Sequence, residues 1–446
     1  RVQLARAVRN RTTGVLYVLD EPSIGLHPYN LQGLTGVMDD LQSDGNSVIL
    51  VDHDTQVLKH ADWMIEMGKG AGAEGGTIIS QGTVEDISKN PESVIGPYLS
   101  DHYESRIRPV TKREALFDKG AIHLETGAIH TVHPLDVRIP MGRLTVVTGV
   151  SGSGKTTMVL ESLIPALRAE ISGQKLPSHV KKVEADGITQ VKLIDATPIG
   201  INVRSTVATY ANVHDGLRKV YARTADAREH HYKAGDFSYN TGKLRCPTCD
   251  GTGEISLDVQ FLPDVQIPCP DCRGSRYRKE AYDIHRKAKD GKEYSLPELM
   301  NMSVDQVLNA LGGLKLLQQR LQVLHDLGLG YLTLGEETPG LSGGEAQRLK
   351  LASEMGKGQS DSVFVFDEPT IGLHLQDVRT LLHVFQTLID HGATLVVIEH
   401  DLDVIRNADY IVDMGPGGGK EGGRIIARGT PEEIRQNTDS LTGRFI

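Results

Sequence analysis

Residues Gly149-Val-Ser-Gly-Ser-Gly-Lys-Thr156 decide the fold expected for this chain. They match G-x-x-x-x-G-K-T, a loop that binds nucleotide phosphates between a buried strand and a helix. The β-branched run at 143–148 is typical of such a strand, and residues 157–163 suit the helix. The alternative is a chance glycine turn, which would need neither neighbour. The stretch therefore predicts a phosphate-binding loop in an α/β fold.

The residue types of this loop predict how it would hold a nucleotide. Glycines let the backbone approach phosphate oxygens, and the helix N-terminus adds partial positive charge. We expect Lys155 to reach the β- and γ-phosphates and Thr156 to hold Mg2+. The residues expected to bind the nucleotide here are Gly149, Ser151, Gly152, Ser153, Gly154, Lys155, Thr156 and Thr157.

Length and composition bound the class of protein. The 446 residues favour two to four domains of about 150 residues each, and 39% of residues are hydrophobic, which is enough for packed cores. The net charge of −10 argues against wholesale coating of nucleic acid, although a local basic patch can lie within it. The sequence has no run of about 18 apolar residues, so we expect no membrane span. Its four cysteines form two C-x-x-C pairs rather than a secreted disulfide scaffold, which favours a cytoplasmic location and a bound metal.

A long-range repeat relates the two ends of the chain. The motif Asp-Glu-Pro-x-Ile-Gly-Leu-His begins at Asp20 and again at Asp367, an offset of 347 positions that holds without a gap through Gly82 and Gly429. Such a match indicates a duplicated domain. We interpret the chain as a C-terminal fragment of a tandem protein that lacks most of its first nucleotide-binding domain.

The second copy carries the residue types of a hydrolytic site. Asp367 and Glu368 end an apolar strand, where an aspartate can hold Mg2+ and a glutamate can orient the attacking water. His400 ends the next strand and is expected to contact the γ-phosphate. Each alone is compatible with an ordinary polar strand end. Together with the phosphate loop they predict ATP hydrolysis, with Glu368 and His400 as the catalytic residues and Asp367 as a ligand of the cofactor.

Leu341-Ser-Gly-Gly-Glu345 precedes an amphipathic stretch at 346–355. A serine followed by glycines at a helix N-terminus can present a hydroxyl and N–H groups to a nucleotide. The pattern resembles the signature motif of the ATP-binding-cassette (ABC) superfamily, in which the signature of one domain closes on the ATP of another. The resemblance implies that Ser342, Gly343 and Gly344 serve a partner's ATP. It also implies weak ATPase activity in this fragment, unless two copies pair in trans.

The four cysteines of the chain form two pairs inside the cassette, Cys246-Pro-Thr-Cys249 and Cys269-Pro-Asp-Cys272. The spacing C-x2-C-x19-C-x2-C predicts one structural Zn2+ held by Cys246, Cys249, Cys269 and Cys272. Four thiols without a metal are the alternative. The run at 246–253 also resembles half of a DnaJ-type zinc repeat, so zinc alone does not identify a function.

The insertion around the cysteines is basic. Residues 204–290 hold 15 Lys and Arg against 12 Asp and Glu, a net charge of +3, while the rest of the chain carries −13. Such residues can contact DNA phosphates, and an exposed aromatic could wedge at a distorted base step. A solvated charged face with core aromatics is the alternative, which charge alone favours. The candidate DNA contacts are Arg204, Arg273, Arg276, Arg278 and Lys279, and the interspersed aromatics are Tyr232, Phe237, Tyr239 and Tyr277.

The whole pattern resembles the UvrA family, the A subunit of the bacterial excinuclease and the damage-recognition ATPase of nucleotide excision repair. The resemblance covers essentially the whole chain, mapped onto the C-terminal half of the family and the tail of its first cassette. The matching segments are Gly149–Thr156, Pro198–Gly200, Ala208–Tyr210, Phe237–Asn240, Phe261–Val265, Gly328–Tyr331, Leu341–Arg348 and Ile398–His400.

The resemblance implies a cytosolic homodimer that binds duplex DNA, preferentially damaged, and loads the excinuclease B subunit using ATP, Mg2+ and Zn2+. The B-subunit site would belong to the N-terminal half of the family. Two departures from the family stand at Asp195-Ala196-Thr197, where a glutamine is expected, and at Ile201, where an arginine is expected. The first departure puts normal ATP coupling in doubt, and the second removes one potential phosphate contact. Together they suggest the hypothesis of a divergent paralogue tied to resistance against DNA-damaging compounds.

Two other functions compete with DNA repair. An ABC export or resistance motor would not need the zinc insertion, and a non-catalytic zinc interaction module would not need intact catalytic residues. The expected fold is an α/β ABC-type cassette with an inserted helical, zinc-binding domain and part of a preceding tandem cassette. The expected boundaries are 1–95 for the first cassette, 96–118 for a linker, 119–200 and 336–446 for the second cassette, and 201–335 for the insertion.

Overall fold

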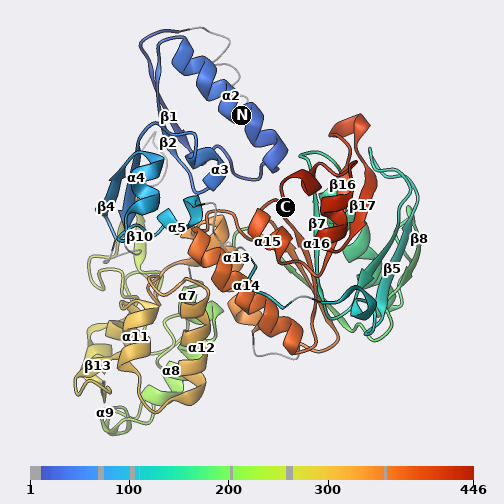
Figure 1. Cartoon of the computed structure of the whole chain (residues 1–446). Helices are drawn as coiled ribbons and strands as arrows, with labels where there is room; N and C mark the ends of the chain where they lie inside the picture. The colour runs from blue at the N-terminus through green and yellow to red at the C-terminus, as the bar shows by residue number, and fades with distance from the viewer. Residues whose placement is uncertain are drawn as a thin grey trace. The chain divides into compact units, whose positions relative to one another are not determined.

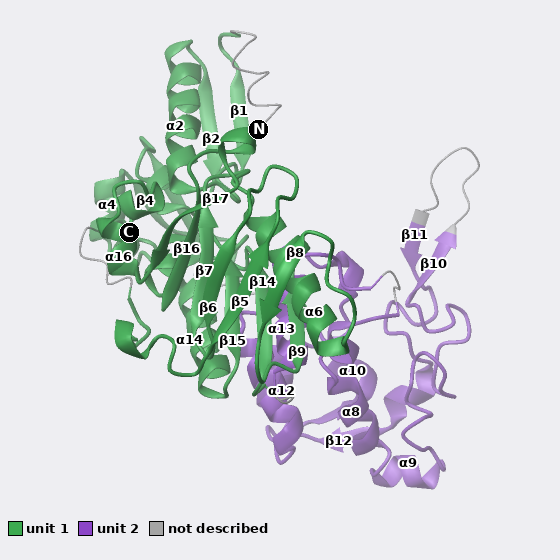
Figure 2. Cartoon of the chain, turned by 90° about the vertical axis from the view of Figure 1, so that its right-hand side faces the viewer, with its two compact units in different colours: residues 1–195, 356–446 green, residues 196–355 purple. Residues whose placement is uncertain are grey.

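The chain folds into two compact units, coloured separately in Figure 2. The larger unit joins residues 1–195 to 356–446, and the smaller one spans 196–355. The computed structural model describes residues 12–68, 75–100, 106–109, 111–200, 204–257, 265–355 and 359–446. Ile201 and most of the Phe261–Val265 segment therefore lie outside the described residues. The smaller unit includes residues 336–355, which the sequence assigned to the second cassette.

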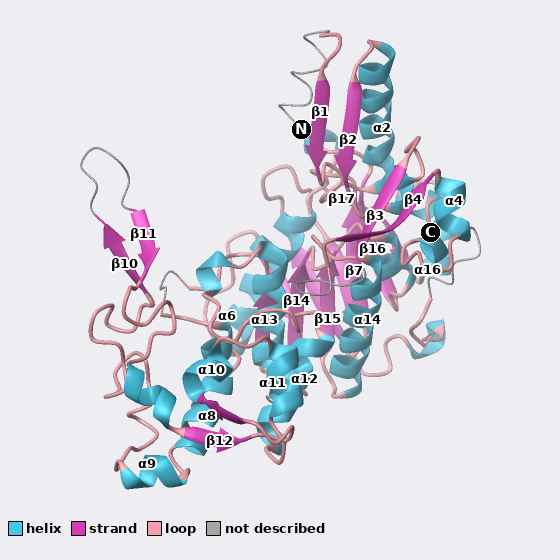
Figure 3. Ribbon diagram, turned by 90° about the vertical axis from the view of Figure 1, so that its left-hand side faces the viewer, coloured by secondary structure: helices cyan, strands magenta, loops and turns pink. Residues whose placement is uncertain are grey.

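The second cassette is built on a six-stranded sheet, seen in Figure 3. The strand order is β17 (Arg424–Gly429), β16 (Tyr410–Gly415), β7 (Leu144–Gly149), β15 (Thr394–Ile398), β14 (Ser362–Asp367) and β9 (Gln190–Ile194). All neighbours pair in parallel except β16 and β17. A second, antiparallel sheet has the order β6 (Asp136–Pro140), β5 (Ala121–Thr126) and β8 (Val180–Glu184).

Helices cover both faces of the six-stranded sheet, which explains why its strands are almost continuously apolar. Val365 and Val396 face one core together with α6, whereas Phe366 on the opposite face meets Phe385 of α14 with ring centroids 4.8 Å apart. The helical elements of this cassette are η2 (Arg113–Ala115), η3 (Thr157–Leu163), α6 (Ile164–Ser172), α14 (Leu375–Asp390), α15 (Leu402–Arg406), η6 (Gly419–Glu421), α16 (Pro431–Gln436) and η7 (Thr442–Arg444). The segment η3 is a π-helical turn rather than an α-helix.

The first copy of the repeat has the same order of elements as its counterpart (Figure 1). It comprises β1 (Leu16–Asp20), α2 (Pro28–Ser43), β2 (Ser47–Val51), α3 (Thr55–Leu58), β3 (Met64–Gly68), β4 (Thr77–Gly82), α4 (Val84–Lys89) and α5 (Gly96–Leu99). Strands β1 and β2 pair in parallel and β3 and β4 antiparallel. The bounds of α2, β2, β4 and α4 match those of α14, β15, β17 and α16 at the 347-residue offset. The duplication read from the sequence is therefore confirmed at the level of elements.

The smaller unit is mostly helical, with short hairpins. Its strands are β10 (Glu254–Leu257), β11 (Val265–Pro268), β12 (His285–Lys287) and β13 (Glu293–Ser295). Its helical elements are α7 (Val207–Tyr210), α8 (Val213–Tyr221), α9 (Ala225–Glu229), η4 (Lys279–Asp283), α10 (Leu296–Met300), α11 (Val304–Ala310), α12 (Lys315–Asp326), η5 (Thr338–Gly340) and α13 (Gly343–Glu354). The helical spacing over 304–324 is realised as two helices, because Gly313 takes a left-handed φ of +74° between them.

None of the helices among the described residues combines the length and the apolar character that a membrane crossing needs.

Candidate functional site

The phosphate loop lies between β7 and η3, in the strand–loop–helix context that the sequence predicts. Gly149 has a φ of +128°, and a Cβ there would lie 2.0 Å from the carbonyl oxygen of Met414. Gly154 has a φ of +98°, and its Cβ would lie 2.6 Å from Cγ2 of Val132. Only glycine lets these neighbours close on the loop. The other predicted nucleotide-binding residues, Ser151, Gly152, Ser153, Thr156 and Thr157, follow in the same loop and turn.

Lys155 is buried at the base of the loop. Its Nζ donates hydrogen bonds to the carbonyl oxygens of Gly149 (2.8 Å) and Val150 (3.0 Å). Burial lowers the pKa of Lys155 to about 8, opposed mainly by the charge of Glu368. The hydroxyl Oγ of Ser153 is buried and has no hydrogen-bond partner among the described residues. A buried cation and an unsatisfied hydroxyl in a glycine loop fit a phosphate ligand.

The two acids at the end of β14 differ in role and environment. Burial and the neighbouring Glu368 raise the pKa of Asp367 to about 6, which indicates a pocket of negative charge suited to Mg2+. Glu368 has a φ of +47°, a strained backbone conformation for this residue type. Its counterpart in the first copy, Glu21, has a φ of +43°. The same strain at both positions of the repeat points to a functional requirement.

Each glutamate lies near the histidine that ends the next strand of its own copy. Nε2 of His400 is 3.4 Å from Oε1 of Glu368, and Nε2 of His53 is 3.5 Å from Oε1 of Glu21. His400 is almost fully buried. The structure thus brings together Lys155, Asp367, Glu368 and His400 in one electrostatic cluster, as the sequence predicts.

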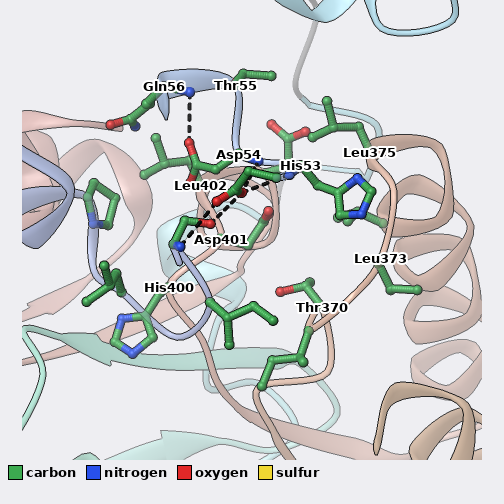
Figure 4. A pocket seen from close by; sticks show the side chains of 18 of the residues that line it. His53, Asp54, Thr55, Gln56, Thr370, Leu373, Leu375, His400, Asp401 and Leu402 are labelled. Atoms are coloured by element: carbon green, nitrogen blue, oxygen red, sulfur yellow. Dashed lines mark hydrogen bonds between the residues drawn. The ribbon is translucent and has the colours of Figure 1, made fainter. Parts of the chain in front are cut away.

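The two copies meet around a cavity of about 420 Å³ that both line with equivalent segments. Figure 4 shows Asp54 and Asp401 near its centre, with His53 and His400 on opposite sides of them. Asp54 accepts a hydrogen bond from the backbone N–H of Gln56 (2.7 Å) and Asp401 accepts one from that of Val404 (3.0 Å). Burial raises the pKa of both aspartates. The charge of Asp54 also contributes to the raised pKa of Asp401, so the loops that carry His53 and His400 are in electrostatic contact.

The signature residues begin a helix in the smaller unit. Ser342 is the N-cap of α13, with Gly343 and Gly344 in its first turn. Its hydroxyl accepts a hydrogen bond from the N–H of Glu345 (3.3 Å), and the Glu345 carboxylate accepts one from the N–H of Ser342 (2.7 Å). This capping box leaves other N–H groups of the first turn for a ligand.

Ala196 and Thr197, two of the residues that depart from the UvrA pattern, lie against this helix. A Cβ on Gly343 would be 3.3 Å from Cβ of Ala196. Nζ of Lys350 donates a hydrogen bond to Oγ1 of Thr197 (2.7 Å). The departure therefore changes the surroundings of the signature motif itself.

The four cysteines form one buried cluster, with all four sulfur atoms within 4.8 Å of one another. The Sγ atoms of Cys246 and Cys269 are 3.9 Å apart, and those of Cys249 and Cys272 are 3.6 Å apart. Tetrahedral Zn2+ with bonds of about 2.3 Å requires sulfurs about 3.8 Å apart. The N–H of Gly253 donates to Sγ of Cys249 (3.3 Å), as expected for a supported thiolate. The donor set fits zinc.

The candidate DNA contacts have different environments. Arg276 is buried, ion-paired with Glu337 (2.6 Å) and placed over the Tyr239 ring, whereas Arg273 is exposed. Arg204 pairs with Asp250 (2.8 Å). Arg278 lies 3.5 Å from Glu280, and Lys279 is exposed.

Most of the interspersed aromatics belong to the core of the smaller unit. Phe237, Tyr239 and Tyr277 are buried, and Tyr232 is half-buried. For the three buried rings the core alternative is confirmed, so they do not offer a free face to a base.

Sequence reasoning missed several residues around Lys155. His27, the last residue of the first repeat motif, is fully buried with its ring centroid 5.9 Å from that of His400. Oδ1 of Asn30 accepts a hydrogen bond from the N–H of Ser151 (3.4 Å). Asp413 is buried on β16, and its negative charge raises the pKa of Lys155 against the effect of burial. The presence of His in both repeat motifs was the available signal, whereas Asn30 and Asp413 have none in a single sequence.

The fold and this site define an ABC-type ATPase cassette joined to part of a second one. A solved complex containing archaeal Pelota and ABCE1 is similar in fold, with a TM-score of 0.51 at 17% identity over 95% of this chain and 54% of that one.

The more similar proteins identify the family. UvrABC system protein A of Thermus thermophilus is 43% identical over 100% of this chain and 46% of its own length, and that of Bacillus subtilis is 42% identical with the same coverage. The crystal structure of UvrA2 from Deinococcus radiodurans matches with a TM-score of 0.88 at 37% identity, over 100% of this chain and 53% of that one. No protein-family model matches the sequence. The chain belongs to the UvrA family, and it spans about half the length of the curated relatives it matches.

Proposed function

We propose that this chain takes part in ATP-dependent recognition of damaged duplex DNA in nucleotide excision repair. The observation that carries the proposal is similarity to UvrABC system protein A over the whole chain at 42–43% identity. The buried four-cysteine cluster inside the cassette supports the same assignment, because an export motor would not need it. In this proposal one Zn2+ holds the inserted module together.

ATP and Mg2+ are proposed to bind at the phosphate loop of the second cassette. Lys155 would neutralise phosphate charge, Thr156 and Asp367 would hold Mg2+, and Glu368 would orient the attacking water with His400 at the γ-phosphate. The signature residues Ser342, Gly343 and Gly344 would serve the ATP of another cassette. This division of labour predicts low, concentration-dependent turnover for the 446-residue chain alone.

Duplex DNA is proposed to contact the exposed basic residues of the smaller unit. Arg273 and Lys279 are the strongest candidates, because both are exposed, and Arg204 and Arg278 are second because each has an acidic neighbour. Arg276 is buried in an ion pair with Glu337. We therefore propose that it supports the zinc-binding module rather than contacting DNA.

The proposed partners follow from the family. They are an excinuclease B subunit and a second copy of the protein, acting in the cytoplasm. Because Ala196 and Ile201 depart from the family pattern, we also propose that the protein is a specialised paralogue within the UvrA family.

Salt-dependent DNA binding tests this assignment. The affinity of the zinc-loaded chain for an undamaged duplex should fall with salt, and the variant R273A/K279A should reduce the slope of log affinity against log salt by about 2. The matched control K292A removes an exposed lysine from a hairpin distant in sequence from the cysteines. Equal slopes for R273A/K279A and the parent chain would contradict the proposed DNA surface.

A further inference from the structure

A second cluster of metal-ligating side chains lies on the antiparallel sheet of the second cassette, which consists of β6, β5 and β8 (Figure 2). His123 and Glu125 come from β5 and Asp136 from β6, and each offers one ligand atom within 4.8 Å of the other two. In the part of the chain that the structure describes, the only other group of this kind is the cysteine cluster. The cluster takes no part in the function proposed above.

The strand register explains why these side chains meet. Residues of β5 are alternately half-buried and buried, so His123 and Glu125 share the outer face of the sheet. Glu125 stands directly opposite Asp136 on β6, and His123 stands directly opposite Glu184 on β8. Directly opposite residues of antiparallel strands project to the same face, with Cβ atoms about 5 Å apart. The sheet therefore gathers one imidazole and three carboxylates on one face.

The ligand atoms have the spacing that a small divalent ion requires. Nε2 of His123 is 2.9 Å from Oδ1 of Asp136 and 3.5 Å from Oε1 of Glu125. Metal bonds of about 2.1 Å to nitrogen and oxygen place two ligand atoms about 3.0 Å apart at a right angle and about 3.4 Å apart at the tetrahedral angle. The two observed distances are close to these values. These side chains can therefore bind one ion in the backbone arrangement that the structure shows.

The second nitrogen of His123 has the partner expected of a metal ligand. Nδ1 is 3.4 Å from Oε2 of Glu184, whose other oxygen, Oε1, is 2.8 Å from Nζ of Lys182. A histidine that binds a metal usually donates its other ring N–H to a carboxylate, which fixes the tautomer. With the proton on Nδ1, the lone pair of Nε2 is available beside Asp136 and Glu125. The His123 side chain is 12% exposed, so packing restricts its rotation.

Cross-strand ion pairs are the alternative explanation of the same contacts. A protonated His123 would donate to carboxylates from both of its nitrogens, and Lys182 and Arg138 supply further positive charge to this face. The two explanations differ in the state of Nε2, which carries a proton in the ion pairs and none in a metal complex. The protonation of one ring nitrogen therefore distinguishes them.

The donor set selects the kind of ion. Imidazole suits zinc, copper, nickel and iron, whereas Mg2+ prefers oxygen ligands in an octahedral arrangement. One imidazole and two carboxylates therefore favour a divalent transition metal over Mg2+. Three protein ligands leave a further coordination position to water. An ion held there would tie Asp136, the first residue of β6, to β5.

We propose that His123, Glu125 and Asp136 bind one divalent transition-metal ion of the Zn2+ type, with Glu184 holding the imidazole in orientation. The site is separate from the structural Zn2+ proposed at the four cysteines. The inference does not depend on the proposed ATP hydrolysis or DNA binding. The role that follows from the geometry is to fasten two strands of the cassette to each other.

Calorimetric titration with Zn2+ tests the proposal on the 446-residue chain already loaded with one Zn2+ per molecule. Excess Mg2+ is present throughout, so that sites made of oxygen ligands alone are filled. The variants are His123→Ala and Glu184→Ala. His130→Ala is the matched control, because Nε2 of His130 is 2.9 Å from Oε2 of Glu161 in the same cassette, and this pair belongs to no three-residue group of ligand atoms within the described residues.

The parent chain should bind a second Zn2+. Glu184→Ala should weaken this binding by about tenfold, because it removes the carboxylate behind the imidazole. His123→Ala should weaken it further, because it removes a ligand itself, and His130→Ala should match the parent chain. Failure of the parent chain to bind a second Zn2+, or an unchanged affinity in His123→Ala, would overturn the proposal.

Spectra of ¹⁵N-histidine locate the ion directly. The second Zn2+ should shift Nε2 of His123 and leave the ring proton on Nδ1, while the ring signals of His130 stay unchanged. Unmoved signals of the other histidines in His123→Ala would show that this variant keeps its fold. A His123 ring with protons on both nitrogens in the presence of the second Zn2+ would identify the cross-strand ion pairs and overturn the proposal.

Discussion

At the scale of single residues, the Lys155 site is a cluster of charges that burial has moved from their ordinary pKa values. Lys155 is shifted toward its neutral form and Asp367 toward its protonated form. Both shifts have burial as their largest cause, which is the expected state of a site built to receive a charged ligand and its cation. Bound phosphate would favour the charged form of Lys155, and bound Mg2+ would favour the charged form of Asp367, so each ligand would oppose the pKa shift that burial causes.

Asp367 gives this site a pH signature. Its pKa rises from 3.8 to about 6, so the fold favours the protonated form, and the contribution of this group to stability is lost as the pH rises from about 4 to about 6. Without metal, the free energy of unfolding should fall over that window by about 1–2 kcal/mol more in the parent chain than in Asp367→Asn, once partial exposure is allowed for.

Denaturant unfolding at a series of pH values, with and without Mg2+, makes this measurement. Mg2+ should stabilise the parent chain more at pH 7.5 than at pH 5, because it binds the carboxylate, and should not do so in Asp367→Asn. Identical pH profiles for the two proteins would refute the assignment of Asp367 as a shifted metal ligand.

At the scale of elements, the zinc module and the signature motif share a buried ion pair. Arg276 follows the last cysteine by four residues and Glu337 precedes Ser342 by five. Their contact is 2.6 Å long, with the Arg276 side chain 4% exposed. The Glu337 side chain is 28% exposed, so removing Arg276 leaves a partly buried carboxylate without this partner, which costs more than breaking an exposed pair.

Breaking this pair should therefore destabilise the smaller unit. Arg276→Met should cost about 3 kcal/mol of unfolding free energy, and the double variant with Glu337→Gln should cost less than the sum of the single changes by about 1 kcal/mol or more. Arg278→Met, which removes an exposed pair with Glu280, should cost less than about 1 kcal/mol. Additive costs in the double-mutant cycle would show that the pair is not coupled.

Zinc removal addresses the same module. A strong chelator should expose the Cys246–Cys272 segment to proteolysis and leave the six-stranded sheet folded, because the cluster lies within the smaller unit. Gly251→Ala should have a similar effect, since a Cβ there would lie 1.8 Å from the carbonyl oxygen of Tyr239. Resistance of the chelated chain to proteolysis at this segment would contradict a structural metal.

Elements that carry strong local patterns could be predicted from the sequence. The strand before the phosphate loop, the repeat and the cysteine cluster follow from apolar runs, a fixed offset and ligand spacing. The break between α11 and α12 was missed although Gly312 and Gly313 mark it in the sequence. The grouping of α13 with the insertion could not be predicted, because tertiary packing decides it. His27 was missed because its ring contact with His400 joins residues that are 373 positions apart in the sequence.

At the scale of the whole molecule, the two copies of the repeat differ in how their sheets are covered. Val365 is fully buried beneath the phosphate-loop half of its cassette, whereas the equivalent Val18 is 63% exposed. Ile49 and Met67 are exposed in the same way, at 51% and 63%. Within the described residues, this face is the one that a phosphate-loop half like residues 119–195 would cover.

The most direct test of the account is the preference for damaged DNA as a function of nucleotide. Fluorescence anisotropy at fixed salt would compare a lesion-bearing duplex with its undamaged counterpart, with and without ATP and Mg2+, for the zinc-loaded chain and for Glu368→Gln. Glu170→Gln, on the exposed side of α6, is the matched control.

We expect tighter binding to the lesion-bearing duplex, a preference that changes when ATP is added, and a different ATP response in Glu368→Gln alone. Equal binding to both duplexes, unaffected by ATP in all three proteins, would contradict ATP-dependent damage recognition.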